Sequence, residues 1–191
     1  MIISSQKINQ KGLVLFIALI ALVAMSLAAV ALIRSVDTST LIAGNLAFKQ
    51  SSLMTADSSI SLASNYVRVN GGSSTLDNNV ANVGYHATAK NLDYKAAATW
   101  TNANSILASG AGFTAGVDSS GNTVRYLIER MCRSQGPATS GNCLLAAVVG
   151  AQANMACSDC PASPGTTPVY RITSRVTDSK NTVSFMQAYI Y

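Results

Sequence analysis

The stretch LVLFIALIALVAMSLAAVALI, residues 13–33, decides the fold. It contains no charged residue, and its one hydroxyl side chain is that of Ser26. About 20 apolar residues in a helix cross the hydrocarbon core of a bilayer, so this stretch is long enough to span a membrane. It also explains why a chain of 191 residues is 49% hydrophobic but only 11% charged. The sequence therefore predicts one apolar segment and one modest domain, and it excludes a polytopic transporter.

The charges that flank the stretch predict its orientation. Lys7 and Lys11 precede it without any acidic residue, whereas Arg34 and Asp37 follow it. The positive-inside rule therefore places residues 1–12 in the cytoplasm and exports the rest, a single-pass topology with the N-terminus inside. A cleaved secretory signal peptide, cut near Ala28-Ala29, is an alternative, but the apolar core of such signals is usually shorter, about 7 to 15 residues.

The helix is expected to continue well beyond the apolar stretch. Apolar residues recur at helical spacing, and the first proline of the chain is Pro137, so nothing earlier forces a kink. We predict one helix from Leu13 to about Val69, roughly 85 Å long at about 1.5 Å per residue. Its second half would pack one face on a globular head. The apolar positions that show this spacing after residue 33 are Ile42, Leu46, Leu53, Ile60, Ala63 and Val67.

The last third of the chain predicts β-strands. Residues 123–131, 169–176 and 182–191 are rich in β-branched and aromatic residues, and the polar residues 177–181 between the last two indicate a hairpin. The glycines in Asn70-Gly71-Gly72 supply the backbone freedom with which a helix ends. Residues 73–121 have weak periodicity, and no element is assigned there.

Four cysteines, Cys132, Cys143, Cys157 and Cys160, all lie on the exported side. An even number in an oxidising compartment favours disulfides. The spacing favours pairing Cys132 with Cys143 and Cys157 with Cys160, because each pair closes a local loop, although the other two connectivities stay open. Zinc is an alternative that usually requires two short cysteine pairs, of which one is present. Catalytic thiol exchange at Cys157 and Cys160 is a second alternative. Such a site usually lies at the start of a helix, whereas prolines follow this motif.

No arrangement of residues predicts catalysis. The chain has one histidine, one glutamate and scattered aspartates, with no spacing that assembles a triad or a carboxylate pair. His86 and Trp100 are interpreted as surface residues or satisfied core residues. The net charge of +5 is not accompanied by a basic stripe interleaved with aromatic residues. We therefore expect no enzyme, no cofactor, no metal and no nucleic-acid partner.

The N-terminus resembles the type III signal of the type IV pilin superfamily, in which a short basic leader ending in glycine precedes an apolar helix. Lys11-Gly12 and the stretch after it are the matching residues. The resemblance implies that prepilin peptidase cuts between Gly12 and Leu13 and that the new amine of Leu13 is methylated. Arg34 with Ala43-Gly44-Asn45, and the YLIER block with the closing strand pair, further resemble PilX-type minor pilins.

This resemblance implies an α+β, pilin-like fold in which the long N-terminal helix packs on a C-terminal antiparallel sheet. The expected parts are a cleaved leader (1–12), a transmembrane and assembly helix (13–33), a periplasmic helix half (34–70) and a globular head (71–191). The implied partners are other minor pilins, the major pilin, a tip adhesin, prepilin peptidase and the inner membrane. The chain would reside in the inner membrane before assembly and at the pilus tip afterwards.

One position departs from most pilins. The fifth residue after the implied cleavage is Ile17, where the family usually has a glutamate that pairs with the N-terminal amine of the subunit ahead. A buried carboxylate without a partner is costly. A subunit that has no other subunit ahead of it has no amine to pair with the glutamate, so it is more stable without that carboxylate. This favours a tip position. The alternatives are a K-type pseudopilin of type II secretion, which usually carries a large inserted subdomain, and a membrane-anchored periplasmic redox or binding protein.

Overall fold

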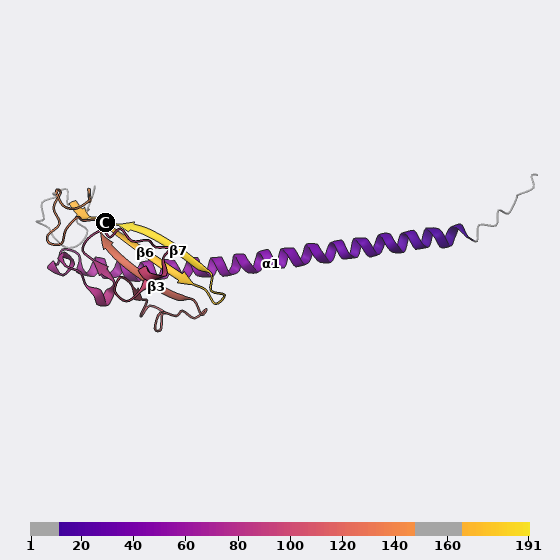
Figure 1. Ribbon diagram of the computed structural model, residues 1–191, viewed down its shortest axis with the longest axis horizontal. Helices are drawn as coiled ribbons and strands as arrows, with labels where there is room; N and C mark the ends of the chain where they lie inside the picture. The colour runs from indigo at the N-terminus through magenta and orange to yellow at the C-terminus, as the bar shows by residue number, and fades with distance from the viewer. Residues whose placement is uncertain (1–11, 148–165) are drawn as a thin grey trace, which may run out of the picture. The chain divides into compact units, whose positions relative to one another are not determined.

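The computed structural model describes residues 12–147 and 166–191. Its longest element is helix α1 (Leu13–Asn70), drawn from indigo to magenta in Figure 1. The chain divides into two compact units, Met1–Ala47 and Phe48–Tyr191. The first contains the apolar part of α1, and the second contains the rest of α1 together with the sheet. The predicted helix is confirmed, and it ends one residue beyond its expected end.

Helix α1 accommodates its polar residues by local bonding. Several hydroxyl side chains donate to the carbonyl oxygen four residues earlier, which satisfies them without interrupting the helix. Gly44 stays helical, and a β-carbon there would meet no other atom within 4 Å. The chain leaves the helix through Gly72, whose φ of 78° is in the left-handed region. The hydroxyls that donate in this way are those of Ser26, Thr38, Ser39, Thr40, Thr55 and Ser58.

Three long strands form the main sheet. Strand β3 (Thr123–Arg130) pairs antiparallel with β6 (Tyr170–Thr177), which in turn pairs antiparallel with β7 (Val183–Ile190). In the turn between β6 and β7, the Asp178 carboxylate accepts hydrogen bonds from the backbone N–H groups of Lys180 and Thr182. All three predicted strands and the predicted hairpin are confirmed.

Shorter elements complete the head. Strand β1 (Tyr85–His86) pairs parallel with β3 and β2 (Ile106–Leu107) pairs antiparallel with it, so the sheet is mixed, with the order β1-β3-β6-β7. A separate pair is formed by β4 (Leu145–Ala147) and β5 (Thr166–Pro168). Three short 3-10 helices lie between α1 and β2: η1 (Ser74–Asp77), η2 (Ala81–Val83) and η3 (Ala97–Trp100). These elements fill the region that sequence patterns left unassigned.

The core of the head lies between the second half of α1 and the sheet. Most of the buried α1 residues are serine, threonine or alanine, whose small side chains allow close approach. The strands contribute β-branched and aromatic side chains. The Ser59 and Ser174 hydroxyls, both fully buried, lie 2.6 Å apart across this interface. The expected α+β fold, with one long helix packed on a C-terminal sheet, is therefore confirmed. The packed residues include Ala56, Ile60, Ala63 and Val67 on α1 and Val124, Ile128, Ile172 and Val176 on β3 and β6.

Candidate functional site

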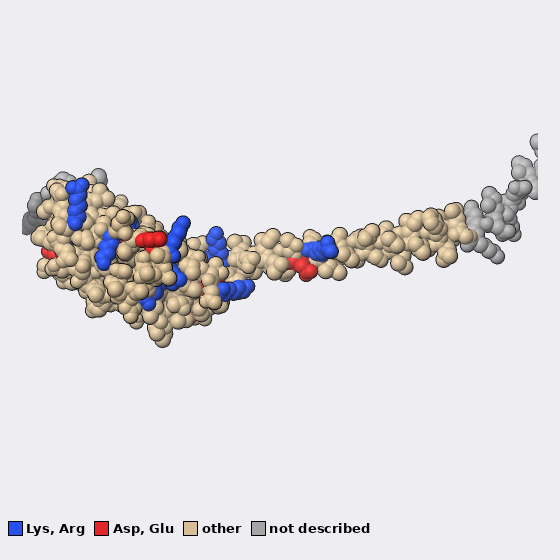
Figure 2. Space-filling model, in the orientation of Figure 1, with Lys and Arg blue, Asp and Glu red and all other residues tan. Residues whose placement is uncertain are grey.

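The apolar part of α1 has no cover in the described chain. Every large apolar side chain in residues 13–33 is exposed, from 47% at Val23 to 74% at Leu15. In Figure 2 this part of the helix has neither blue nor red atoms. By length and composition the helix can cross a membrane, and none of its apolar window is buried as the core helix of a soluble domain would be.

Exposure of these apolar side chains to water is unfavourable, so the segment needs an apolar environment around it. Burying a Leu, Ile, Val, Phe or Met side chain gains about 1.5 to 3 kcal/mol, so a whole segment of exposed apolar side chains is strongly driven out of water. The hydroxyl of Ser26 donates to the carbonyl oxygen of Leu22 at 2.8 Å, so the segment presents no unpaired hydroxyl to an apolar environment. The segment fits a lipid bilayer or a bundle of similar helices.

The predicted cleavage site lies at the first turn of α1. Leu13 is the first helical residue, 56% exposed, and the Gly12 carbonyl oxygen accepts a hydrogen bond from the backbone N–H of Phe16. Ile17 is also exposed, and the first turn contains no acidic residue. Residues 1–11 of the predicted leader lie outside the described chain.

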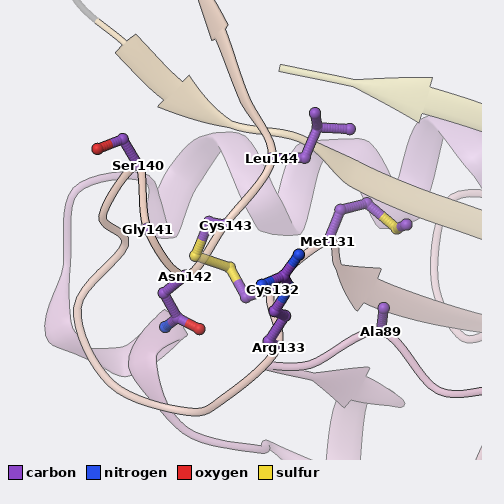
Figure 3. Close-up of a pocket in the computed structure, with 9 residues that line it drawn as sticks. All are labelled: Ala89, Met131, Cys132, Arg133, Ser140, Gly141, Asn142, Cys143 and Leu144. Carbon is purple, nitrogen blue, oxygen red and sulfur yellow. A yellow bond between two sulfur atoms is a disulfide. The ribbon is translucent and has the colours of Figure 1, made fainter.

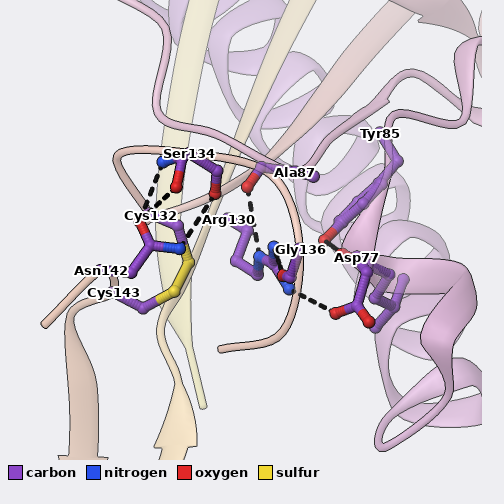
Figure 4. Close-up of a disulfide and its surroundings, with 10 residues drawn as sticks. Asp77, Tyr85, Ala87, Arg130, Cys132, Ser134, Gly136, Asn142 and Cys143 are labelled. Carbon is purple, nitrogen blue, oxygen red and sulfur yellow. Dashed lines mark hydrogen bonds and ion pairs between the residues drawn. A yellow bond between two sulfur atoms is a disulfide. The ribbon is translucent and has the colours of Figure 1, made fainter. Parts of the chain in front are cut away.

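In the head, Cys132 and Cys143 form a disulfide, as the spacing predicted. The bond closes a loop that is further held by Asn142, whose side chain accepts from the backbone N–H of Ser134 at 2.9 Å and donates to its carbonyl oxygen at 3.2 Å (Figure 4). Loop-closure entropy assigns such a bond about 2 to 3 kcal/mol of stability. The predicted partners Cys157 and Cys160 lie outside the described residues.

Arg130, which is 1% exposed, connects this loop to the rest of the head (Figure 4). Its guanidinium donates to the Gly136 carbonyl oxygen at 2.6 Å and to the Ala87 carbonyl oxygen at 3.2 Å, and it forms an ion pair with Asp77 at 3.2 Å. Because buried charges are costly unless paired and hydrogen-bonded, this side chain joins the disulfide loop to two segments that lie 43 and 53 residues away in sequence.

A cavity of about 370 Å³ opens beside the disulfide (Figure 3). Met131 and Leu144 border it together with the disulfide, and Ser140 and Asn142 lie on the loop side. Of its described lining residues, Arg133 carries the one ionisable side chain. Among these described lining residues, the Ser140 hydroxyl has no histidine or carboxylate beside it that could act as a general base.

Glu129 forms the second buried ionic centre of the head, on the strand position next to Arg130. Its carboxylate is fully buried and accepts from Arg171 at 2.9 Å, from the Tyr94 hydroxyl at 2.7 Å and from the backbone N–H of Lys90 at 2.8 Å. Burial and the hydrogen bond to this carboxylate raise the pKa of Tyr94. Because its oxygens are already bonded within the head, the carboxylate has a structural rather than a catalytic environment.

His86 and Trp100 are both core residues. The Trp100 indole N–H donates to the Tyr94 carbonyl oxygen at 2.8 Å. His86 Nε2 lies 2.7 Å from the Asn104 carbonyl oxygen, and burial lowers the pKa of its ring. Its Nδ1 is buried without a hydrogen-bond partner among the described residues. No cluster of three or more His, Cys, Asp or Glu side chains that could hold a metal occurs in residues 12–147 and 166–191.

A third polar cluster ties α1 to the loop before β3. The Asp118 carboxylate accepts from the Thr55 hydroxyl and from the Asn122 side-chain amide, and Asn122 also donates to Ser51. Burial raises the pKa of Asp118, but the hydrogen bonds from Thr55 and Asn122 outweigh this and lower it. The register between helix and sheet is therefore fixed by polar contacts as well as by packing.

Sequence reasoning missed these polar clusters, although one signal was present. Glu129 and Arg130 are adjacent within a run of apolar strand residues, and neighbouring strand residues point to opposite faces of a sheet. Two adjacent charged residues in such a run indicate that both faces of the sheet are buried at this point. Each charged side chain then needs an oppositely charged or hydrogen-bonding partner. The partners themselves, Arg171 and Asp77, are distant in sequence and carry no local signal.

No family model, curated protein or solved structure matches this chain.

Proposed function

We propose that this chain is a minor pilin of the PilX type, which primes assembly of a type IV pilus and sits at its tip. It would be anchored in the inner membrane with its N-terminus in the cytoplasm and cleaved after Gly12. The apolar helix would then leave the bilayer for the pilus core, where it packs against other minor pilins and the major pilin. The head would face partner subunits or a tip adhesin.

The observation that carries the proposal is the uncovered apolar part of α1, residues 13–33, on the same helix that packs on the sheet of the head. Small side chains recur along it and permit close approach between helices in the absence of water. A plain membrane anchor needs neither a glycine at its cytoplasmic boundary nor a helix that continues into the core of its domain. The small residues are Ala18, Ala21, Ala24, Ser26, Ala28 and Ala29.

The tip position is supported by Ile17. Its exposed side chain is apolar, so this subunit brings no carboxylate into the helix bundle that would need a neighbouring amine. A subunit within the shaft would have such an amine ahead of it, whereas the first subunit has none.

Deletion of the gene and counting of surface pili tests the priming role. The proposal expects far fewer pili, restored by the wild-type gene supplied in trans. Normal piliation of the deletion strain would contradict it. Immunogold labelling of the head tests the position separately: label confined to filament ends is expected, and label along the shaft would contradict a tip location while leaving pilin membership intact.

A further inference from the structure

We propose that the free edge of strand β7 is a docking site for an extended segment of another protein, which adds to the sheet as a further strand. The proposal rests on the sheet and not on the pilus assignment. Strand β7 is the last strand of the order β1-β3-β6-β7, and among residues 12–147 and 166–191 no strand pairs with its far side.

The register shows which backbone groups lie on that far side. The N–H groups of Val124 and Ile128 donate away from β6, to Gly116 and Gly84. Because hydrogen-bonded pairs alternate in an antiparallel ladder, the odd-numbered residues of β3 and β6 bond to each other, as in the pair Leu127 and Thr173. The odd-numbered residues of β6 therefore direct their backbone groups to β3, and its even-numbered residues direct theirs to β7. Each even-numbered residue of β6 is paired with an even-numbered residue of β7, so the even-numbered residues of these two strands bond to each other.

It follows that residues 183, 185, 187 and 189 direct their backbone N–H and C=O groups to the free edge. Such a row of unpaired groups recognises an extended backbone, and natural proteins usually protect it with charges, proline, bulges or short length. Strand β7 has eight residues, VSFMQAYI, without a charge or a proline. Its pairing with β6 is continuous over all eight. Strand β7 itself therefore has none of these four forms of protection.

The side chains at the edge favour an apolar, uncharged partner segment. Phe185 and Tyr189 are 42% and 55% exposed, on the sheet face opposite the core-facing Met186 and Ile190. A segment added here would place alternate side chains beside these rings, and aromatic cross-strand pairs stabilise a sheet.

A groove lies where β7 ends. It has a volume of about 360 Å³ and is lined by the last turns of α1, by strand β5, and by the first residue of β6 and the end of β7. Strand addition typically takes its affinity from main-chain hydrogen bonds and its specificity from pockets for alternate side chains. The groove supplies such a pocket. Its apolar lining includes Val67, Pro168, Tyr170, Ile190 and Tyr191.

A second copy of this chain fits the edge less well. Two β7 strands paired antiparallel about a two-fold axis would bring the turn before one strand toward the groove of the other. Lys180 lies in that turn, and Arg68 lines the groove, so like charges would approach each other. A different protein that supplies an uncharged segment avoids this repulsion.

The test uses the full-length chain in detergent micelles. The probe is a peptide of alternating valine and threonine, about eight to ten residues long to match a strand, with an uncharged glycine-serine tail at one end for solubility. Amide hydrogen exchange by NMR is measured with and without the probe. We expect the amides of Phe185, Gln187 and Tyr189 to exchange rapidly in the free chain and to become protected on binding.

A matched pair of variants tests the backbone directly. Gln187→Pro removes an N–H group from the free edge without removing a bond to β6, whereas Gln187→Ala keeps that N–H group. Both lose the hydrogen bond from the Gln187 side chain to Thr173. Because Gln187→Pro removes one backbone hydrogen bond to the probe and proline also disturbs the neighbouring residues, this variant should bind the probe about tenfold more weakly than Gln187→Ala.

Three results would overturn the proposal. The first is no protection of the three amides at saturating probe, and the second is equal affinity of the two variants. The third is protection of these amides in the probe-free chain, which would mean that the chain itself or a second copy already covers the edge. If Gln187→Pro does not fold, the exchange measurement on the wild-type chain still decides.

Discussion

At the scale of single residues, the head is organised around charges that sequence patterns alone do not pair. Glu129 and Arg130 are neighbours on one strand, yet each has its own partner, Arg171 in one case and Asp77 in the other. Replacing a buried ion pair by apolar residues can be neutral, but removing one partner leaves an uncompensated charge. Single substitutions at these positions should therefore be costly, although they alter little volume.

Replacing the carboxylate of Glu129 tests this directly. Glu129→Gln keeps the shape but leaves Arg171 without its counter-charge in a partly buried position. We expect the free energy of unfolding of the full chain, measured in urea, to fall by about 3 kcal/mol. The matched control is Asp93→Asn, an exposed carboxylate whose change should stay within about 0.5 kcal/mol. Equal effects of the two substitutions would contradict the structural role of Glu129.

His86 predicts a pH dependence. Burial lowers its pKa in the folded chain, so below about pH 6.5 the unfolded chain binds a proton that the folded chain does not. The unfolded state then gains stability as pH falls, and the free energy of unfolding decreases. We expect the wild type to lose stability between about pH 7 and pH 5, and His86→Gln to lose less. Identical pH profiles would show that His86 is not the titrating group.

At the scale of elements, the sequence predicted what depends on local pattern. The absence of proline before Pro137 and the spacing of apolar residues predicted α1, and β-branched runs predicted β3, β6 and β7. The region 73–121 could not be predicted, because its strands are two residues long and its form depends on distant contacts. A β-carbon at Gly84 would lie 3.1 Å from the Tyr126 carbonyl oxygen, a constraint that no local pattern reveals.

In the candidate site, too, contacts between residues close in sequence could be predicted, whereas contacts between distant residues could not. Cys132 and Cys143 are close in sequence, and their pairing followed from spacing. The ion pairs of Arg130 and Glu129 join segments that are 53 and 42 residues apart. Such partners depend on the topology of the sheet, which the sequence indicated only in outline.

The apolar helix can be tested with two matched substitutions. Leu22 and Leu41 are 67% and 69% exposed on the same helix, but Leu22 lies within the predicted span and Leu41 beyond it. Arginine at the centre of a membrane helix costs about 2.5 to 3.5 kcal/mol. Leu22→Arg should therefore reduce the fraction of chain that resists carbonate extraction from membranes, whereas Leu41→Arg should not. Equal extraction of both variants would contradict the predicted span.

The disulfide loop offers another test at this scale. Replacing both Cys132 and Cys143 by serine should lower the free energy of unfolding by about 2 to 3 kcal/mol. The control is Ser140→Ala, which changes the same loop at an exposed position and leaves the disulfide intact. If the double variant were as stable as the control, the loop would be held by Arg130 and Asn142 alone.

At the scale of the whole molecule, the chain combines an uncovered apolar helix segment with a head whose polar groups are largely satisfied internally. The segment requires a cover, and the head contains buried ionic centres but no assembled catalytic group among its described residues. A subunit that assembles into a filament needs these two properties. Its helix must move from the lipid bilayer into contact with other helices, and its stable head must present surfaces to neighbouring subunits. The pilus proposal accounts for both.

The mass of the mature N-terminus tests this proposal most directly. The chain is purified from the membranes of cells that make the pilus, and its N-terminal peptide is measured by mass spectrometry, with Gly12→Val as the unprocessed control. We predict a chain that begins at Leu13 with a methylated amine. A chain that begins at Met1 would indicate an uncleaved anchor, and one that begins near Ser35 a secreted protein. Either result would contradict the proposed minor pilin.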